Sequence, residues 1–284
     1  MENARTHAQT ADARPDGVTA SLQFTAATGE TPVALVKVPG AGLDERSGTF
    51  EQHDVFIRDG RPLADRLDLD VEGFALRRHG TAVRDFYDDD EVRRVYYPEM
   101  DALIKTVTGA SEVVIFDHTI RIDDAAARDE RKVRPPATIV HNDFTETSAA
   151  QRVRDLLPAG DAEARLAKRY GSINVWRPIR GPVETAPLVI CEYGAIADGD
   201  LITSERHYPD GRVGRIYHIA YNPAQRWTYF PDMTPDEVIV LKCFDSLTDG
   251  TARWTAHGSF TDPNTPAGAA PRESIEIRSM MFYD

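Results

Sequence analysis

The sequence predicts a mainly β protein, an antiparallel sandwich or jelly roll with flanking helices. Seven short β-rich runs occupy about half of the chain from residue 172 onward and are separated by Gly, Pro, Asp and Asn turns. Such a series is typical of sandwiches and jelly rolls, whereas parallel α/β sheets alternate strands with helices. With 284 residues, 41% of them hydrophobic, the chain can bury a sizeable core.

The first third of the chain combines strands with one long helix. Residues 21–26 and 31–38 read as strands separated by turn residues. A helix is predicted over Asp89–Thr108, because apolar residues recur there at helical spacing and acidic residues occupy its first turn. Gly109 is expected to end this helix.

The remaining elements follow in order. Residues 111–122 read as a strand, Asp123–Arg134 as a charged loop, and Ser148–Leu157 and Asp161–Tyr170 as two short helices. The seven β-rich runs are 172–179, 187–193, 214–222, 226–230, 237–246, 252–257 and 273–283. We therefore expect a polar leader over residues 1–19 and a single domain over 20–284, with its β core at about 112–284.

Composition excludes several classes of function. The net charge is −13 and no basic block is present, which argues against a nucleic-acid partner. No segment has the length of a membrane span, and the first twenty residues lack the apolar centre of a secretory signal, so a cytoplasmic protein is expected. Cys191 and Cys243 lie in separate apolar runs and read as reduced core thiols. No feature indicates the oligomeric state.

The segment TIVHNDFTET, residues 138–147, carries the first candidate for chemistry. Thr138, Ile139 and Val140 read as a strand that delivers His141 and Asp143. Residues i and i+2 of a strand point to the same face, so this imidazole and carboxylate would project together. They form two-thirds of the 2-His-1-carboxylate triad of non-haem iron enzymes. Because a chain with 8 His gives about one His-x-Asp by chance, the motif alone favours an ordinary strand end over a metal site.

A second imidazole lies further along the chain. His257 ends the β-rich run 252–257, and a turn follows it. If the sandwich brings the two strand ends together, His257 completes the triad. His118, His207 and His218 compete for this role, although His118 and His218 lie in the middle of strands and read as structural histidines.

The last β-rich run supplies a candidate anion site. Arg272 and Ser274 share one face of the strand and follow His257 in the chain. An arginine binds a carboxylate through two hydrogen bonds, and a neighbouring hydroxyl can add one more. The pair suits the distal carboxylate of a dicarboxylate such as 2-oxoglutarate. The alternative is an arginine paired with Glu273 or Glu276 on a solvated face.

In this order, the motifs resemble those of Fe(II)/2-oxoglutarate-dependent oxygenases. The resemblance is greatest to microbial hydroxylase/desaturases of secondary metabolism, which include the fungal gibberellin desaturase group, AsaB-like hydroxylases and proteins associated with cephamycin methoxylation. The similar stretches are VHNDFT, INVWRPI, RWTYFPDM, DEVIVLKCFDS, AHGSFTDP and PRESIEIR, between Val140 and Arg278. The resemblance implies a double-stranded β-helix (a jelly-roll, cupin-like core), Fe(II), and 2-oxoglutarate and O2 as cosubstrates.

Residue by residue, the resemblance implies that His141, Asp143 and His257 hold the iron. Arg272 would bind the distal carboxylate of 2-oxoglutarate with help from Ser274, and Arg278 on the same strand face is a rival. The implied reaction is hydroxylation or desaturation of a small-molecule intermediate, with loss of CO2 from 2-oxoglutarate.

Two of the similar stretches suggest further contacts. Asn174 in INVWRPI and Tyr229 in RWTYFPDM could contact cosubstrate or substrate, whereas Trp176 and Trp227 read as core residues. Lys242 and Asp245 are expected to form a structural ion pair.

Two alternatives remain open at the level of sequence. A cupin-like metal hydrolase or isomerase could use the same ligands, but it would not need Arg272 and Ser274. A non-catalytic partner of a biosynthetic enzyme such as a methyltransferase would not need the three ligands.

Overall fold

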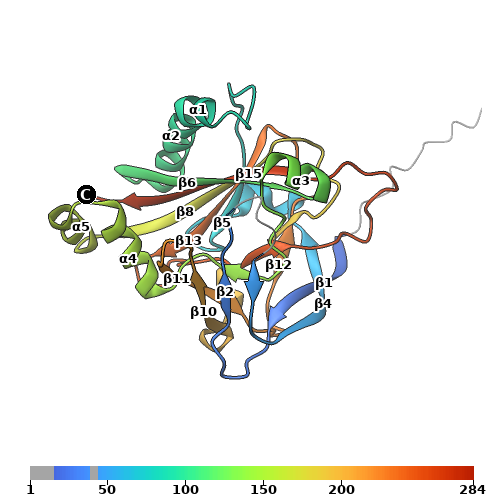
Figure 1. Cartoon of the computed structure of the whole chain (residues 1–284), viewed down its shortest axis with the longest axis horizontal. Helices are drawn as coiled ribbons and strands as arrows, with labels where there is room; N and C mark the ends of the chain where they lie inside the picture. The colour runs from blue at the N-terminus through green and yellow to red at the C-terminus, as the bar shows by residue number, and fades with distance from the viewer. Residues whose placement is uncertain (1–15, 39–43) are drawn as a thin grey trace, which may run out of the picture.

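Two facing β-sheets form the centre of the protein (Figure 1). The computed structural model describes residues 16–38 and 44–284. Most of the predicted leader lies outside the described residues, and the first strand begins at Gly17, four residues before the predicted start. This arrangement confirms the predicted jelly roll, since the strands of both sheets are almost all antiparallel.

The larger sheet has ten strands in the order β1-β4-β12-β9-β14-β7-β11-β10-β2-β3. Its strands are β1 Gly17–Thr25, β2 Val33–Leu35, β3 Glu45–Arg46, β4 Phe50–Asp59, β7 His141–Asn142, β9 Leu188–Cys191, β10 Leu201–His207, β11 Val213–Ile219, β12 Trp227–Tyr229 and β14 His257–Ser259. The sheet therefore combines strands from both ends of the chain, and the short strand β7 lies near its centre.

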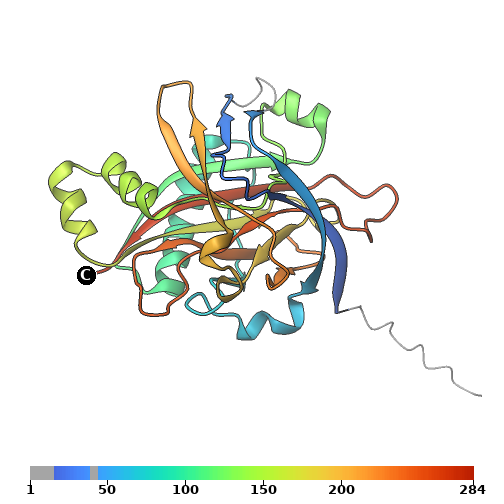
Figure 2. The same cartoon turned by 90° about the horizontal axis from the view of Figure 1, so that it is seen from below.

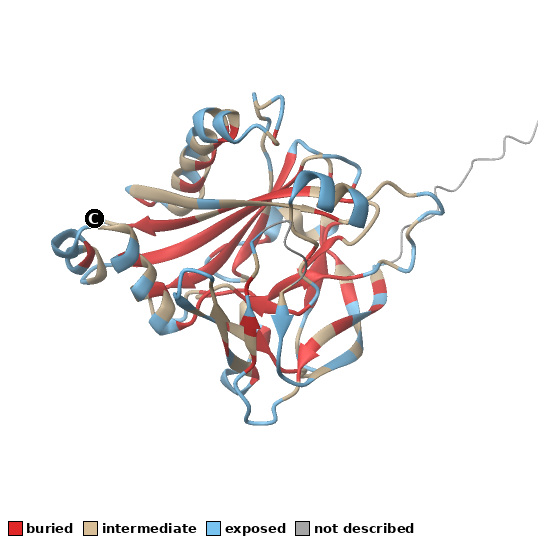
Figure 3. Cartoon of the chain, viewed as in Figure 1, coloured by how far each residue is buried: buried red, intermediate tan, exposed pale blue. Residues whose placement is uncertain are grey.

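The smaller sheet has five strands in the order β5-β13-β8-β15-β6. They are β5 Phe74–Arg78, β6 Glu112–Ile122, β8 Tyr170–Pro178, β13 Glu237–Asp245 and β15 Glu273–Phe282. The strands β8 and β13 are buried throughout, as Figure 3 shows in red for the centre of this sheet. The mostly apolar sequence of β13 agrees with burial on both faces, whereas β8 also buries the polar side chains of Ser172, Asn174 and Arg177.

Helices cover one face and one end of the smaller sheet. The α-helices are α1 Asp89–Glu91, α2 Tyr97–Thr108, α3 Ala125–Arg131, α4 Glu146–Leu156 and α5 Ala159–Leu166; a π-helical turn, η2 Val92–Tyr96, joins α1 to α2. Short 3-10 turns occupy η1 Arg61–Arg66, η3 Tyr193–Ala195 and η4 Asp198–Asp200. Figures 1 and 2 show α2 lying against the sheet and α4 and α5 at its end.

The smaller sheet separates two apolar layers. On its outer face, Tyr96, Met100 and Ile104 of the helical segment pack against a cluster that includes Val175 and Ile277. On its inner face a second cluster fills the space toward the larger sheet. The inner-face positions of β15 alternate with the outer ones, so this strand can present polar side chains to the interior while Ile275 and Ile277 face α2.

The long helix ends as the sequence predicts. Asp88 accepts hydrogen bonds from the backbone N–H groups of Asp90 and Glu91, and Gly109 ends α2 in the left-handed conformation at φ 70°. The acidic run before Val92 is therefore the start of a helix. The π-helical turn in its middle was not predicted.

Several secondary-structure predictions were wrong or incomplete: strands β4 and β5 were not predicted, and of the predicted run 252–257 only His257 lies in a strand. The charged segment Asp123–Arg134 is not a loop throughout, because Asp124 caps the short helix α3. Strand β10 was missed, since its mixed sequence LITSERH lacks an apolar run. The strand that carries the first histidine is His141–Asn142, not the preceding Thr138–Val140.

Two minor predictions are confirmed. Lys242 Nζ lies 3.0 Å from Asp245 Oδ2 and both side chains are buried, which makes the ion pair structural. Cys191 and Cys243 are free and buried.

Among the described residues, the helices are too short or too polar to span a membrane.

Candidate metal centre

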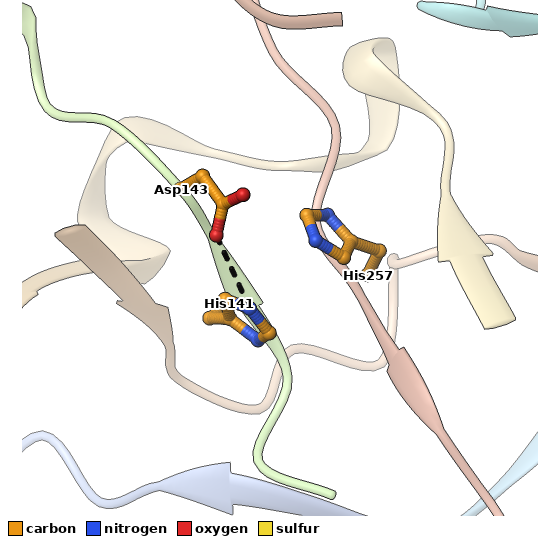
Figure 4. A group of neighbouring side chains, drawn as sticks. All are labelled: His141, Asp143 and His257. Atoms are coloured by element: carbon orange, nitrogen blue, oxygen red, sulfur yellow. Dashed lines mark ion pairs between the residues drawn. The ribbon is translucent and has the colours of Figure 1, made fainter. Parts of the chain in front are cut away.

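His141, Asp143 and His257 converge between the two sheets, as Figure 4 shows. Their candidate ligand atoms all lie within 4.8 Å of one another. The His141 and His257 ring centroids are 4.6 Å apart, and His141 Nε2 lies 3.5 Å from Asp143 Oδ1. Two imidazoles and one carboxylate on one side of a site are the donor set of a facial triad.

Strand pairing explains this convergence of residues distant in sequence. The short strand β7 lies between β14 and β11, and His141 is paired in register with His257 of β14. Paired residues of adjacent strands point to the same face, so the two rings meet. Asn142 points the other way and donates hydrogen bonds to the carbonyls of Phe144 and Cys243. The predicted projection of His141 with Asp143 is confirmed.

Each imidazole has one nitrogen committed to the backbone. His141 Nδ1 lies 2.8 Å from the Ile139 carbonyl oxygen, and His257 Nδ1 lies 3.4 Å from that of Thr255. A carbonyl oxygen accepts only, so each Nδ1 carries the proton and each Nε2 presents a lone pair. This orientation by a backbone carbonyl is characteristic of metal-binding histidines.

The two oxygens of Asp143 have different surroundings. Oδ2 accepts hydrogen bonds from Asn174 Nδ2 at 2.8 Å and from Arg278 Nε at 3.1 Å. Oδ1 faces His141 and accepts no hydrogen bond from these groups. The carboxylate is therefore oriented to give a metal one oxygen, while β8 and β15 hold the other.

The charge states of the triad suit a cation. Burial lowers the pKa of His141 to about 4, so its ring is neutral at neutral pH. Burial acts in the opposite sense on Asp143, but Arg278, His141 and His257 hold the pKa of this carboxyl well below its usual value. A neutral imidazole and an ionised carboxylate are the forms that bind a metal.

Arg272 and Ser274 form a second buried polar group on the same strand face. Arg272 donates to the Ala186 carbonyl and lies over the Trp176 ring, 5.6 Å from its centroid. Its Nε and the Ser274 hydroxyl are buried without a hydrogen-bond partner among the described residues. Burial lowers the pKa of Arg272 to about 10, with Asp123 and Glu276 opposing this effect. Two unpartnered donors side by side in a buried position can bind one anionic group.

Arg278, the rival anchor, already donates hydrogen bonds to four side chains of the protein. Besides Asp143, it donates to Asp117 at 3.1 Å, to Thr119 at 2.7 Å and to Glu276 at 2.6 Å. Its pKa is raised well above the usual value, because these carboxylates outweigh the effect of burial. Arg278 therefore orients the Asp143 carboxylate through its hydrogen bond to Oδ2.

Of the two remaining candidates, Asn174 lies beside the triad and Tyr229 does not. Asn174 is buried beside the triad and donates to Asp143 and Glu276. Tyr229 is not brought to the triad: it pairs with Val189, the partner of Gly258, whereas His257 pairs with Ile190. Adjacent residues of a strand point to opposite faces, so Tyr229 lies on the face away from His257, where it packs against Phe260.

The competing histidines have other partners. The Nδ1 atom of His218 lies 3.0 Å from the Thr25 hydroxyl. His118 lies 3.0 Å from the Tyr97 hydroxyl and 3.3 Å from Asp89. His207 lies 3.0 Å from Glu205. The structural interpretation of His118 and His218 is consistent with these contacts.

One member of the site was missed in the sequence. Glu276 is buried and bonded to both Asn174 and Arg278, so it orients the two groups that hold Asp143. The sequence could have indicated Glu276, because Ser274, Glu276 and Arg278 are two residues apart and therefore lie on the same face of one strand. A second arginine on this face needs such a counter-charge.

Replacing Asn174 with alanine is expected to weaken metal binding about 10- to 100-fold, because Asp143 Oδ2 loses one of its two orienting donors. Titration of the metal-free protein with Mn(II), followed by electron paramagnetic resonance, measures this change. Ser172→Ala is the matched control, since Ser172 is also buried on β8 but donates to the Ser279 carbonyl. An unchanged midpoint for Asn174→Ala would show that Arg278 alone orients the carboxylate.

Comparison with known proteins agrees with this geometry. A family model described as "Oxidoreductase/YMDC permease-like domain" matches residues 22–282. The chain is 35% identical over 280 residues to the hydroxylase/desaturase efuI of Hormonema carpetanum, covering 87% of this chain and 92% of that protein. It is 30% identical to the Fe(II)/2-oxoglutarate-dependent dioxygenase nvfI of Aspergillus novofumigatus, covering 86% and 88% of the two chains.

The fold is similar as well. The solved structure of the iron and alpha-ketoglutarate-dependent endoperoxidase NvfI superposes with a TM-score of 0.82 at 28% identity, covering 94% of this chain and 98% of that one. With its His-Asp-His site between the sheets of a jelly roll, the chain belongs to the family of Fe(II)/2-oxoglutarate-dependent dioxygenases that includes these fungal hydroxylase/desaturases.

Proposed function

We propose that this protein uses Fe(II), 2-oxoglutarate and O2 to hydroxylate or desaturate a small-molecule intermediate of secondary metabolism. The observation that carries the proposal is the convergence of His141, Asp143 and His257, whose ligand atoms lie within 4.8 Å of one another. The names of the relatives, hydroxylase/desaturase and Fe(II)/2-oxoglutarate-dependent dioxygenase, support it.

The residues present fit both groups. His141 Nε2, His257 Nε2 and Asp143 Oδ1 would hold the iron, since the other nitrogen or oxygen of each side chain already has a partner in the protein. Arg272 Nε and the Ser274 hydroxyl, both buried and unpartnered, would bind the distal carboxylate of 2-oxoglutarate. A metal hydrolase or isomerase would have no dicarboxylate cosubstrate for these two donors to bind.

When bound, the iron supplies the oxidation of a substrate C–H bond, which is coupled to decarboxylation of 2-oxoglutarate to succinate. The protein contributes orientation and charge. Arg278 and Asn174 keep Asp143 ionised and fix its direction, and burial keeps His141 neutral. The outcome is set by which C–H bond of the bound substrate lies nearest the triad.

We also propose that the chain from β1 onward forms one oxygenase domain, which moves the domain start from residue 20 to Gly17, and that the protein acts in the cytoplasm. The distribution of early and late strands within one sheet supports the single domain. The absence of a membrane-spanning helix from the described residues is compatible with the location.

An anaerobic titration tests the proposed function. Fe(II) and then 2-oxoglutarate are added to the metal-free protein, and the weak visible charge-transfer band of the chelate is recorded. The band is expected only after both additions. Iron binding without the band would favour the hydrolase or isomerase, and the absence of iron binding would favour the non-catalytic partner.

A further inference from the structure

A cavity of about 1200 Å³ opens between the two sheets and reaches Asp143 and Arg278. Of the residues that the structure describes, nine arginines and four aspartates line it, and no lysine or glutamate does. The lining therefore carries an excess of five positive charges, although the whole chain has a net charge of −13. Such a reversal of sign inside a cleft concentrates anions there.

The centre of this positive charge is Arg206 of β10. The register of the larger sheet pairs Arg206 with Gly214 of β11 and with Ala34 of β2, and pairs Ala34 in turn with Arg46 of β3. These positions share one face of the sheet, and Ala34 and Gly214 are too small to cover Arg206. The same face carries His141, which is paired with His218 four residues further along β11 than Gly214.

Arg121 faces this group from the other sheet. It lies on β6 opposite Ser274 and lines the same cavity. Within the described residues, its side chain donates one hydrogen bond, of 2.8 Å, to the Pro135 carbonyl. Burial is the main cause that lowers the pKa of Arg121 to about 9; Arg278, Arg206 and Arg272 add to this effect, and Glu276 opposes it.

The arginines of this group lack sufficient counter-charge within the described residues. Arg121 and Arg206 have no carboxylate within ion-pair distance, and Arg206 has no hydrogen-bond partner there. Arg46 has Asp44 at 3.8 Å. Burial and then Arg206 lower the pKa of Arg46, and Asp44 only partly opposes them. Neighbouring cations without anions are costly, and a bound anion would relieve this cost.

The cavity also has apolar walls. Val36, Phe50, Phe116, Ile139, Phe144 and Ile216 contribute to its lining. An occupant that matches both features has an apolar body and at least one carboxylate or phosphate group. Arg272, Ser274 and His257 do not line this cavity, which adjoins the subsite proposed for the distal carboxylate of 2-oxoglutarate because Arg121 is paired with Ser274.

We propose that the substrate is an organic anion, held by its oxyanion group between Arg206 and Arg121 with Arg46 nearby, so that its apolar body extends to the triad. This inference rests on the proposed function, because it assigns the substrate of the same site. Two arginines from opposite sheets can grip one oxyanion from two sides, which fixes orientation as well as charge.

The test uses shape-matched fluorescent probes: 2-naphthoate, 2-naphthyl phosphate and the neutral 2-naphthamide. Each is titrated into protein that holds saturating Mn(II) and 2-oxoglutarate, so that the proposed cosubstrate site is filled. At least one anionic probe is expected to bind about tenfold or more tightly than the amide. The tighter anion identifies the group that the substrate carries.

The Arg206→Gln variant is expected to lose this preference, with binding of the preferred anion weakened about tenfold and binding of the amide unchanged. Arg215→Gln is the matched control, because Arg215 lies on the same hairpin and lines the same cavity but is paired with Glu205 at 3.2 Å. Equal binding of anions and amide, no anion binding, or a full preference in Arg206→Gln would overturn the proposal.

Failure of this inference is distinguishable from failure of the proposed function. The Fe(II)–2-oxoglutarate band reports only on the metal and cosubstrate, and it is expected in both wild-type protein and Arg206→Gln. A band without anion preference rejects the organic-anion substrate alone. Loss of the band in wild-type protein rejects the oxygenase itself.

Discussion

Replacing His141 with alanine is expected to abolish turnover and remove the Fe(II)–2-oxoglutarate charge-transfer band. His141 is buried in β7, where it is paired with His257 of β14, and among the described residues Asp143 is the only polar partner of its Nε2 atom. Altering groups that only orient a metal ligand weakens binding about 10- to 100-fold, so loss of a ligand should exceed about 100-fold. Mn(II) titration of the variant, followed by electron paramagnetic resonance, measures the loss.

The control for this prediction is His118→Ala. His118 is also a partly buried strand histidine with an acidic neighbour, but its partners are Tyr97 and Asp89. Metal affinity in this variant is expected to equal that of the wild type. The circular dichroism spectrum of His141→Ala should match that of the wild type, because the alanine leaves the β7 backbone pairing in place. A His141→Ala variant with a normal band would rule out the proposed iron site.

The fold could be predicted from sequence where the pattern was regular. Strand β13 contains a long apolar run, β8 is rich in β-branched and aromatic residues, and the helix after Asp88 has both an apolar stripe and a glycine stop. Strand β10 was not predicted, because its sequence, LITSERH, mixes charged with apolar residues. Its charged side chains include Arg206, which faces the cavity, so the local rule fails at a position with a proposed binding role.

The candidate site was predictable to the extent that it depends on alternation along one strand. The i, i+2 rule placed His141 with Asp143, and Arg272 with Ser274. It could not place Tyr229, because that requires the pairing of β12 with β9 and of β9 with β14. Nor could it separate Arg272 from Arg278, since the difference lies in partners from other strands, Asp117 and Asp143.

The second large effect is expected for Arg272→Gln, which should raise the 2-oxoglutarate concentration at half-maximal band intensity about 100-fold. Loss of one partner of a buried, hydrogen-bonded charge pair typically costs about 2–5 kcal/mol, and about 2.7 kcal/mol corresponds to 100-fold. The Fe(II) affinity should stay within about twofold, because Arg272 contacts none of the three ligands. Ser274→Ala removes a neutral hydroxyl and should give a smaller shift of about fivefold.

Thermal stability distinguishes a role of Arg272 in binding 2-oxoglutarate from a purely structural role. Burial lowers the pKa of Arg272 to about 10, which means that folding disfavours its charged form; the destabilisation is present at neutral pH and fades as the pH rises above that value. The ligand-free Arg272→Gln protein should therefore melt no lower than the wild type, while the stabilisation given by 2-oxoglutarate is lost. Arg180→Gln, an exposed arginine 3.6 Å from Glu273, is the control and should change neither quantity. If Arg278→Gln shifts the 2-oxoglutarate midpoint and Arg272→Gln does not, then Arg278 is the anchor and the unpartnered donors of Arg272 serve another ligand.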